Sequence, residues 1–184
     1  MEQEEKTPTL LNHGLKWGVI CGAISIFLVV MLYVIDYTMM VQIKFLLISL
    51  VISLTAVSYA GVEYRKSVGG FLSYGKAWQV SFVTFAVSGL CYTFFSMLLY
   101  FVIDTELPSK LVDASMENQR VMMESFGAPA DTIDTEVEKA RGRTENQFTV
   151  SGLGMGFGIS LIIYAILSTI TAIFAKKSQP VEQM

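Results

Sequence analysis

The stretch WGVICGAISIFLVVMLYVI, residues 17–35, decides the fold because it contains no charged side chain. An α-helix rises about 1.5 Å per residue, so roughly 20 apolar residues cross the ~30 Å hydrocarbon core of a bilayer. Three further stretches have the same character, at residues 45–62, 77–103 and 146–175. The sequence therefore predicts an all-α, polytopic membrane protein that folds as a bundle of four spanning helices.

The composition supports a membrane protein independently of any single stretch. Hydrophobic residues make up 53% of the 184 residues and charged residues only 16%, which is too apolar for an ordinary soluble domain. No cleavage site follows the first stretch, so we expect it to be retained as a span. We expect one membrane domain over residues 1–184, with spans at about 15–35, 45–63, 77–103 and 148–175.

Lysine and arginine residues in the short flanking segments predict the orientation. With four spans, the N-terminal segment, the second connection and the C-terminal segment share one side of the membrane. These three segments carry Lys6, Lys16, Arg65, Lys66, Lys76, Lys176 and Lys177. The first connection lies on the other side and carries Lys44 alone. We therefore expect both termini to be cytoplasmic.

The connection at residues 104–147 is predicted to be an extracytoplasmic, amphipathic helical hairpin. It holds ten acidic and five basic side chains, and apolar residues recur in it at helical spacing. They are Leu107, Leu111, Val112, Met116, Met122, Met123 and Phe126 in the first helix and Ile133, Val137 and Ala140 in the second. Gly127 and Gly142 supply helix stops. Methionines 116, 122 and 123 would form an adaptable surface for a partner. Whether the hairpin packs on the bundle, the membrane or a partner stays open, and we favour the bundle.

Two spans carry faces of small residues that allow helix backbones to approach closely in lipid. The first span has Gly14, Gly18 and Gly22 at intervals of four, and the last has Gly152, Gly156 and Ser160. We therefore expect the first and last spans to make the tightest contacts. The contact is either within the bundle or between two copies in a homo-oligomer, and we favour the former.

The third span carries a stripe of hydroxyl groups. Its members are Ser81, Thr84, Ser88, Tyr92 and Ser96, with spacings of three and four. Such a stripe is compatible with a narrow path for a neutral solute. Hydroxyls in membrane helices more often bond to neighbouring helices or to their own backbone, so we favour packing.

No catalytic, cofactor-binding or metal-binding constellation is visible in the sequence. The single histidine, His13, precedes the first apolar stretch and is expected to be interfacial or solvated. Hydroxyl nucleophiles in the spans have no general base beside them. The glycine run at residues 152–158 lies inside a predicted span, where it does not meet the requirements of a dinucleotide fingerprint. We therefore expect neither an enzyme nor a cofactor, and no nucleic acid as a partner.

Several motifs together resemble the uncharacterised bacterial membrane-protein family called domain of unknown function 4199. The motifs are Tyr59-Ala60-Gly61 before Tyr64-Arg65, Gly70 to Ala77, Asp104 at the end of the third stretch, and Met116 to Phe126 with its Gly-Ala-Pro-Ala-Asp continuation. Such proteins often have proline after that aspartate, where this chain has Thr105. The resemblance implies a small four-span protein of the bacterial cytoplasmic membrane, and it supplies no catalytic residues.

These observations lead us to expect an integral inner-membrane protein that is a non-enzymatic interaction or assembly component. The bilayer is its first partner, and a membrane or periplasmic protein is its second. Two alternatives stay open: a small transporter or channel for a neutral solute, and a membrane sensor that uses the loop at residues 104–147.

Overall fold

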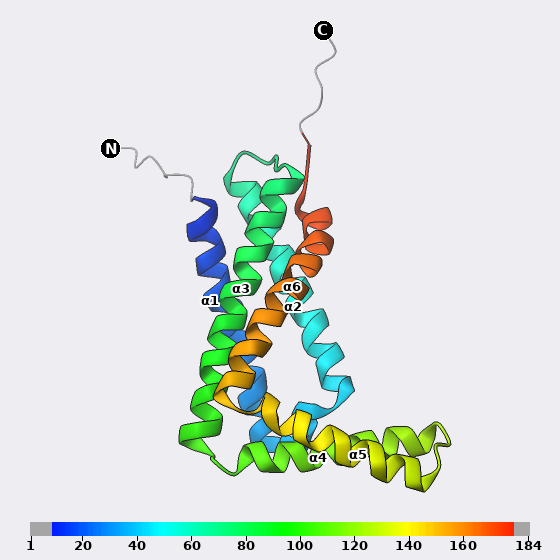
Figure 1. The fold of residues 1–184 in the computed structure, drawn as a ribbon. Coiled ribbons are helices and arrows are strands. Elements are labelled where there is room, and N and C mark those ends of the chain that lie inside the picture. Colours follow the sequence, from blue (N-terminus) through cyan, green and yellow to red (C-terminus); the bar gives the residue numbers. More distant parts are fainter. Residues whose placement is uncertain (1–8, 179–184) are drawn as a thin grey trace. The chain divides into compact units, whose positions relative to one another are not determined.

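The structure is a computed structural model and describes residues 9–178. Within these residues the chain forms six α-helices and two short helical turns of other types (Figure 1). In chain order they are α1 (Leu10–Asp36), the 3₁₀ turn η1 (Tyr37–Val41), α2 (Ile43–Ser67), α3 (Tyr74–Leu98), the π-helical turn η2 (Leu99–Ile103), α4 (Leu107–Ser125), α5 (Ala130–Gln147) and α6 (Val150–Ala175). The predicted all-helical fold is confirmed.

Four of these segments are long and apolar enough to cross a membrane. They are Leu10–Val41, Ile43–Ser67, Tyr74–Ile103 and Val150–Ala175. The first begins five residues before the predicted position 15, and the third begins at Tyr74 rather than 77. The predicted four spans are confirmed by length and composition, whereas the side of the membrane that each connection occupies stays a prediction.

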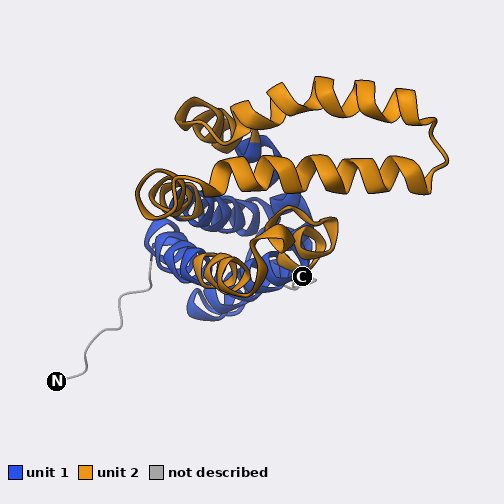
Figure 2. Ribbon diagram, turned by 90° about the horizontal axis from the view of Figure 1, so that it is seen from below, with its two compact units in different colours: residues 1–24, 50–91, 160–184 blue, residues 25–49, 92–159 orange. Residues whose placement is uncertain are grey.

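The described residues form two compact units, which Figure 2 colours separately. Unit 1 takes the described parts of Met1–Ile24, Leu50–Cys91 and Ser160–Met184, and unit 2 consists of Ser25–Ser49 and Tyr92–Ile159. Each of α1, α2, α3 and α6 therefore contributes one part to each unit. The expectation of one domain over residues 1–184 stays a prediction.

In unit 1, the glycines of α1 lie against α3. A Cβ atom added at Gly18 would lie 2.5 Å from the Cβ of Val87 and 3.1 Å from the carbonyl oxygen of Thr84. Gly14 and Gly22 meet Val83 and Cys91 in the same way, with ideal Cβ distances of 2.7 Å. The glycine face of α1 thus allows another helix to approach closely, as predicted. The prediction that this helix is the last span is wrong, because the helix is α3.

The small residues at the start of α6 have other surroundings. A Cβ at Gly152 would collide with the backbone of Asn146 and Gln147, which lead into its own helix. A Cβ at Gly156 would meet no heavy atom outside its own helix and chain neighbours within 4 Å, and Ser160 is half-buried. Gly152 is therefore required by the turn before α6, and Gly156 makes no close approach to another helix within residues 9–178.

Further contacts of unit 1 join α2 to α1 and α6. His13 on α1 is buried, its Nε2 atom lies 2.9 Å from the carbonyl oxygen of Ala60, and its ring lies beside Tyr64. A Cβ at Gly61 would lie 2.7 Å from the Cβ of Ala175 on α6. The expectation that His13 is solvated is therefore wrong, because α1 begins early enough to carry this residue into the packed core. An interfacial depth of His13 in the membrane stays a prediction.

In unit 2, Asp104 connects the end of the third span to α4. Its Oδ1 atom accepts hydrogen bonds from the backbone N–H groups of Glu106 and Leu107, each at 3.1 Å. Its Oδ2 atom accepts a hydrogen bond from the hydroxyl of Tyr33 on α1 at 3.1 Å and lies 4.0 Å from Nζ of Lys110. One carboxylate therefore holds the first turn of α4 beside α1.

The contact between α1 and α3 predicts an asymmetry between two glycines. Gly18→Ala should lower the free energy of unfolding by about 1–3 kcal/mol, because the added methyl must push against Val87 and the backbone of Thr84. Gly156→Ala is the matched control and should leave stability unchanged or raise it by up to ~1 kcal/mol through helix propensity. Denaturation by sodium dodecyl sulfate in mixed micelles measures both, and equal losses would contradict this packing.

The role of Asp104 predicts local loosening of α4. Asp104→Ala should cost about 1 kcal/mol at the first turn of the helix, so amide hydrogens near Leu107 should exchange roughly fivefold faster. Hydrogen exchange read by mass spectrometry measures the change. Ser125→Ala is the control, because the Ser125 hydroxyl donates to the carbonyl of Met122 at the other end of α4. Exchange in α4 that responds equally to both substitutions would argue against a specific role of Asp104.

Candidate functional site

The hydroxyl stripe of α3 is divided between the two units, with Ser81, Thr84 and Ser88 in unit 1 and Tyr92 and Ser96 in unit 2. In unit 1, Ser81 and Thr84 are fully buried, and Thr84 donates a hydrogen bond to the carbonyl of Val80 in its own helix. The α-carbon of Ser88 lies 3.6 Å from where a Cβ of Gly22 would stand. Thr84 and Ser88 therefore lie at the contact between α3 and α1, because their backbones approach Gly18 and Gly22.

In unit 2, the two remaining members of the stripe differ in exposure. Tyr92 is exposed, whereas Ser96 is buried and forms a side-chain hydrogen bond with Tyr100. The hydroxyl of Ser81, in contrast, is buried and has no hydrogen-bond partner within the described residues. Each position of the stripe thus has its own environment.

Helices α4 and α5 form a hairpin whose two arms run side by side and away from the other segments of unit 2 (Figure 2). Its base is buried: Leu107 and Leu111 pack with Tyr37 and Met40 of η1. Met116 is buried too, so the expected adaptable methionine surface does not include it. The base of the hairpin is thus part of the core of unit 2.

Ion pairs brace the two arms of the hairpin against each other. Nη2 of Arg120 lies 2.7 Å from Oδ1 of Asp134, and Nη2 of Arg141 lies 2.8 Å from Oδ1 of Asp113. These hydrogen bonds raise the pKa of Arg120 and of Arg141 above the ordinary arginine value. Both guanidinium groups therefore stay charged at any physiological pH, and the braces do not titrate away through the arginines.

At its far end the hairpin exposes apolar side chains. Phe126 is 83% exposed, Met122 55% and Val121 54%, and we call these three residues the tip patch. Gly127 follows with φ of +76°, a conformation that glycine adopts without strain and that turns the chain toward α5. Glu117, Glu124 and Asp131 are exposed close to the patch in sequence and form no ion pair within residues 9–178. We call these three carboxylates, which flank the tip patch in sequence, the acidic rim; Glu117 and Glu124 also lie near enough to Arg120 to raise its pKa.

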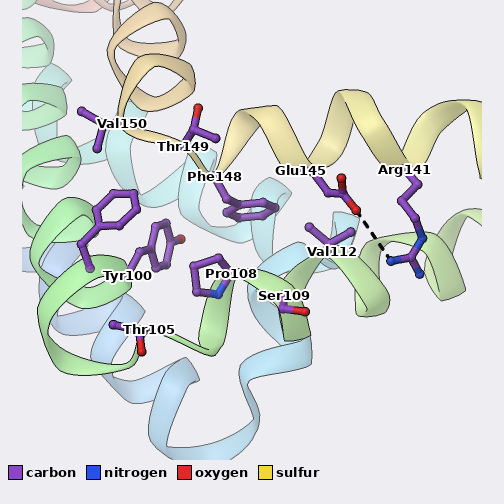
Figure 3. A pocket seen from close by; sticks show the side chains of 11 residues that line it. Tyr100, Thr105, Pro108, Ser109, Val112, Arg141, Glu145, Phe148, Thr149 and Val150 are labelled. Atoms are coloured by element: carbon purple, nitrogen blue, oxygen red, sulfur yellow. Dashed lines mark ion pairs between the residues drawn. The ribbon is translucent and has the colours of Figure 1, made fainter.

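A pocket of about 480 Å³ lies where the hairpin joins the span ends in unit 2 (Figure 3). Its lining comes from η2, the start of α4, the end of α5 and the start of α6: Tyr100, Phe101, Thr105, Pro108, Ser109, Val112, Arg141, Glu145, Phe148, Thr149 and Val150. The rings of Tyr100 and Phe148 meet edge to face, with centroids 5.7 Å apart. Ligand pockets typically measure about 300–1,000 Å³, so this one is of useful size.

The two charged side chains of the pocket project from one face of α5 toward α4 (Figure 3). Nη1 of Arg141 lies 3.9 Å from Oε1 of Glu145, a separation too long for a hydrogen bond. The other terminal nitrogen of Arg141 is held by Asp113. The pocket therefore presents an oriented guanidinium and a carboxylate that do not saturate each other.

Sequence reasoning did not find this pocket, because its walls come from two stretches, residues 100–112 and 141–150, that are separated along the chain. From the sequence, Arg141 and Glu145 are interpreted as charges on a solvated helix, and Tyr100 is interpreted as part of a span. Their spacing of four residues on α5 was the available signal, since it places two side chains on one helix face. Among residues 9–178 no group of three or more histidine, cysteine or acidic side chains is placed to hold a metal ion.

Comparison with known proteins finds one matching family model, whose description assigns no function. The model of the family described as "Protein of unknown function (DUF4199)" matches residues 16–177. No curated protein and no solved structure matches the chain. The match covers all four candidate spans in whole or in large part, together with the hairpin.

The environment of Ser81 yields a prediction about the hydroxyl stripe. Ser81→Ala should leave the free energy of unfolding unchanged or raise it by up to ~1 kcal/mol, because it removes a buried hydroxyl without a partner. Ser168→Ala should lower it by about 0.5–1 kcal/mol, because the Ser168 hydroxyl donates to the carbonyl of Tyr164. Both residues are fully buried serines in unit 1, so denaturation in mixed micelles compares them directly. A larger loss for Ser81→Ala than for Ser168→Ala would show that Ser81 has a partner in the membrane.

Proposed function

The chain belongs to the DUF4199 family, and we propose that it is a non-enzymatic interaction or assembly component of a membrane that binds a partner protein through the hairpin tip. The observation that carries this proposal is the contrast between the two ends of the hairpin. The base is buried and braced, yet the end of α4 exposes Val121 and Met122, and Phe126 directly after the helix is exposed as well. A rigid arm that ends in apolar side chains is suited to docking.

Rigidity matters here because an ordered surface loses little conformational entropy when it binds. The Arg120–Asp134 ion pair spans the two arms, and Ile133 of α5 is buried in the hairpin. Phenylalanine and methionine are both enriched in the centres of protein interfaces. The tip patch therefore has the side chains of a binding anchor on a support that is already in place.

The acidic rim favours a protein partner over the lipid surface. Glu117, Glu124 and Asp131 would lose hydration if the tip patch entered the headgroup layer, and anionic lipids would repel them. A partner that offers an apolar pocket surrounded by lysine or arginine would neutralise these carboxylates. We therefore expect binding that weakens as the salt concentration rises.

We further propose that the protein lies in a bacterial cytoplasmic membrane with both termini in the cytoplasm and the hairpin outside. In unit 1 the second connection and the end of α6 lie together: Leu72 forms an antiparallel bridge with Lys177, and Arg65 donates to the carbonyl of Ala175. Lys16 at the start of α1 pairs with Glu63 at 3.9 Å. These contacts support the proposal that the second connection and the end of α6 lie on the same, positively charged side of the membrane as the start of α1. Lys6, which was counted for the same side, lies outside the described residues.

The surroundings of the α3 hydroxyls favour this role over transport of a neutral solute. Thr84 bonds to its own helix, and Ser81 is buried in unit 1. A polar path would instead need hydroxyls that face water or solute. The packing of these residues thus supports the interaction role.

The proposal predicts that capture of a partner depends on the tip patch. A photo-crosslinking amino acid at position 126 should capture one protein reproducibly in intact cells, and Met122→Ser should reduce its yield roughly tenfold, as loss of an interface anchor does. Glu124→Lys should also weaken capture because it reverses a charge beside the patch. Mass spectrometry of the crosslinked band identifies the partner and quantifies the yield.

Glu138→Lys is the matched control, because it makes the same charge change on α5, eight residues after the helix begins. It should leave the crosslink unchanged. Crosslinks to lipid alone, or a yield that responds equally to Glu124→Lys and Glu138→Lys, would contradict the proposed docking surface.

A further inference from the structure

The pocket of unit 2 lies at the ends of two candidate spans. Phe101 belongs to the third span, Tyr74–Ile103, and Val150 is the first residue of the fourth, Val150–Ala175. Span ends are the level at which the hydrocarbon core gives way to the headgroup layer. An occupant of this pocket therefore has hydrocarbon on one side and polar surroundings on the other.

The lining combines apolar and polar side chains, and both of its charged side chains lie on α5. Phe101, Val112 and Phe148 provide apolar surface, and the Phe101 side chain is exposed beside the pocket. Ser109, Arg141 and Glu145 provide the polar surface on α4 and α5. The combination fits an amphiphile, whose apolar part contacts the aromatic side and whose polar part contacts α5.

The charges of the pocket specify what kind of polar group fits. Arg141 can donate two hydrogen bonds to a phosphate through nitrogen–hydrogen groups that Asp113 does not use. Glu145 lies four residues further along α5 and offers a carboxylate that no hydrogen bond in the described structure occupies. One positive and one negative group side by side match a headgroup that carries both a phosphate and an ammonium.

We propose that this pocket binds a zwitterionic phospholipid with a primary ammonium headgroup, of the phosphatidylethanolamine class. Arg141 binds the phosphate, Glu145 accepts a hydrogen bond from the ammonium, and the start of the acyl region lies against Phe101. This lipid site is separate from the tip patch and does not depend on the proposed partner.

The chemistry of the pocket distinguishes this headgroup from its two common alternatives. A choline headgroup has a quaternary nitrogen without N–H bonds, so it cannot donate to Glu145. A glycerol headgroup has no ammonium to pair with Glu145, so this carboxylate stays uncompensated beside the phosphate and repels it. The site should therefore rank ethanolamine above choline and glycerol headgroups.

Native mass spectrometry of the full-length protein in detergent, titrated with each of the three phospholipids, tests this ranking. Phosphatidylethanolamine should bind roughly tenfold more tightly than phosphatidylcholine or phosphatidylglycerol, as one charge-assisted hydrogen bond allows. Glu145→Gln should abolish the preference for phosphatidylethanolamine over phosphatidylcholine. Arg141→Gln should weaken the binding of phosphatidylethanolamine and of phosphatidylcholine roughly tenfold each.

Two control variants separate lipid binding from the integrity of the hairpin. Lys139→Gln breaks an exposed ion pair with Glu136 on the same helix and leaves the pocket lining intact, so lipid binding should not change. Asp113→Asn breaks the brace but leaves both pocket charges, so the preference for ethanolamine should persist. If Arg141→Gln fails to fold, Arg141→Lys, which keeps a charge without the planar fork, should show a smaller loss of the same kind.

Equal retention of the three lipids by the unsubstituted protein would overturn the proposal and leave an unspecific lipid shell only. Loss of the preference in Asp113→Asn or Lys139→Gln, to the same extent as in Glu145→Gln, would overturn it as well. A preference that Glu145→Gln alone abolishes would support the assignment.

Discussion

Close approach between α1 and α3 is the constraint on which the rest of unit 1 depends. In lipid the hydrocarbon solvent is as apolar as the side chains, so helices associate through dispersion and weak hydrogen bonds rather than through the hydrophobic effect. Dispersion acts over a short range, and Gly14, Gly18 and Gly22 let Val83, Val87 and Cys91 reach the backbone of α1. The burial of His13 beside Ala60 and of Thr84 beneath Gly18 accompanies this approach.

A second constraint acts where the chain leaves the third span. The backbone of α4 begins with unpaired N–H groups, and any such group near the hydrocarbon boundary is costly. Asp104 satisfies two of the backbone N–H groups at this corner and also bonds to Tyr33. The direction of the hairpin base and the end of α1 are thereby fixed by one side chain, and the pocket wall at Thr105 and Pro108 follows directly from it.

Sequence patterns predicted elements well and partners poorly. Charge-free length alone predicted four spans, and apolar spacing with Gly127 predicted the hairpin, because both are local properties. The predicted partner of the α1 glycines, α6, was wrong. A face of small residues indicates that another helix packs closely against it, but it does not indicate which helix. The burial of Met116 and His13 was not predicted for the same reason, since it depends on which segments pack together. The pocket was not predicted either, because its walls come together only through the turn at Asp104 and the return of α5.

The π-helical turn η2 has a consequence for how the chain can change in length. Its closing hydrogen bond runs from the N–H of Asp104 to the carbonyl of Leu99 at 2.9 Å, five residues back instead of four. Such a turn accommodates one residue more than an α-helix would over the same rise. Deleting one residue between positions 99 and 103 would therefore let this turn close as an ordinary α-helix, with α3 and Asp104 in the same rotational phase. A deletion elsewhere in the span would instead rotate every following side chain, so the chain tolerates a change of length best here, beside the pocket to which Tyr100 and Phe101 contribute.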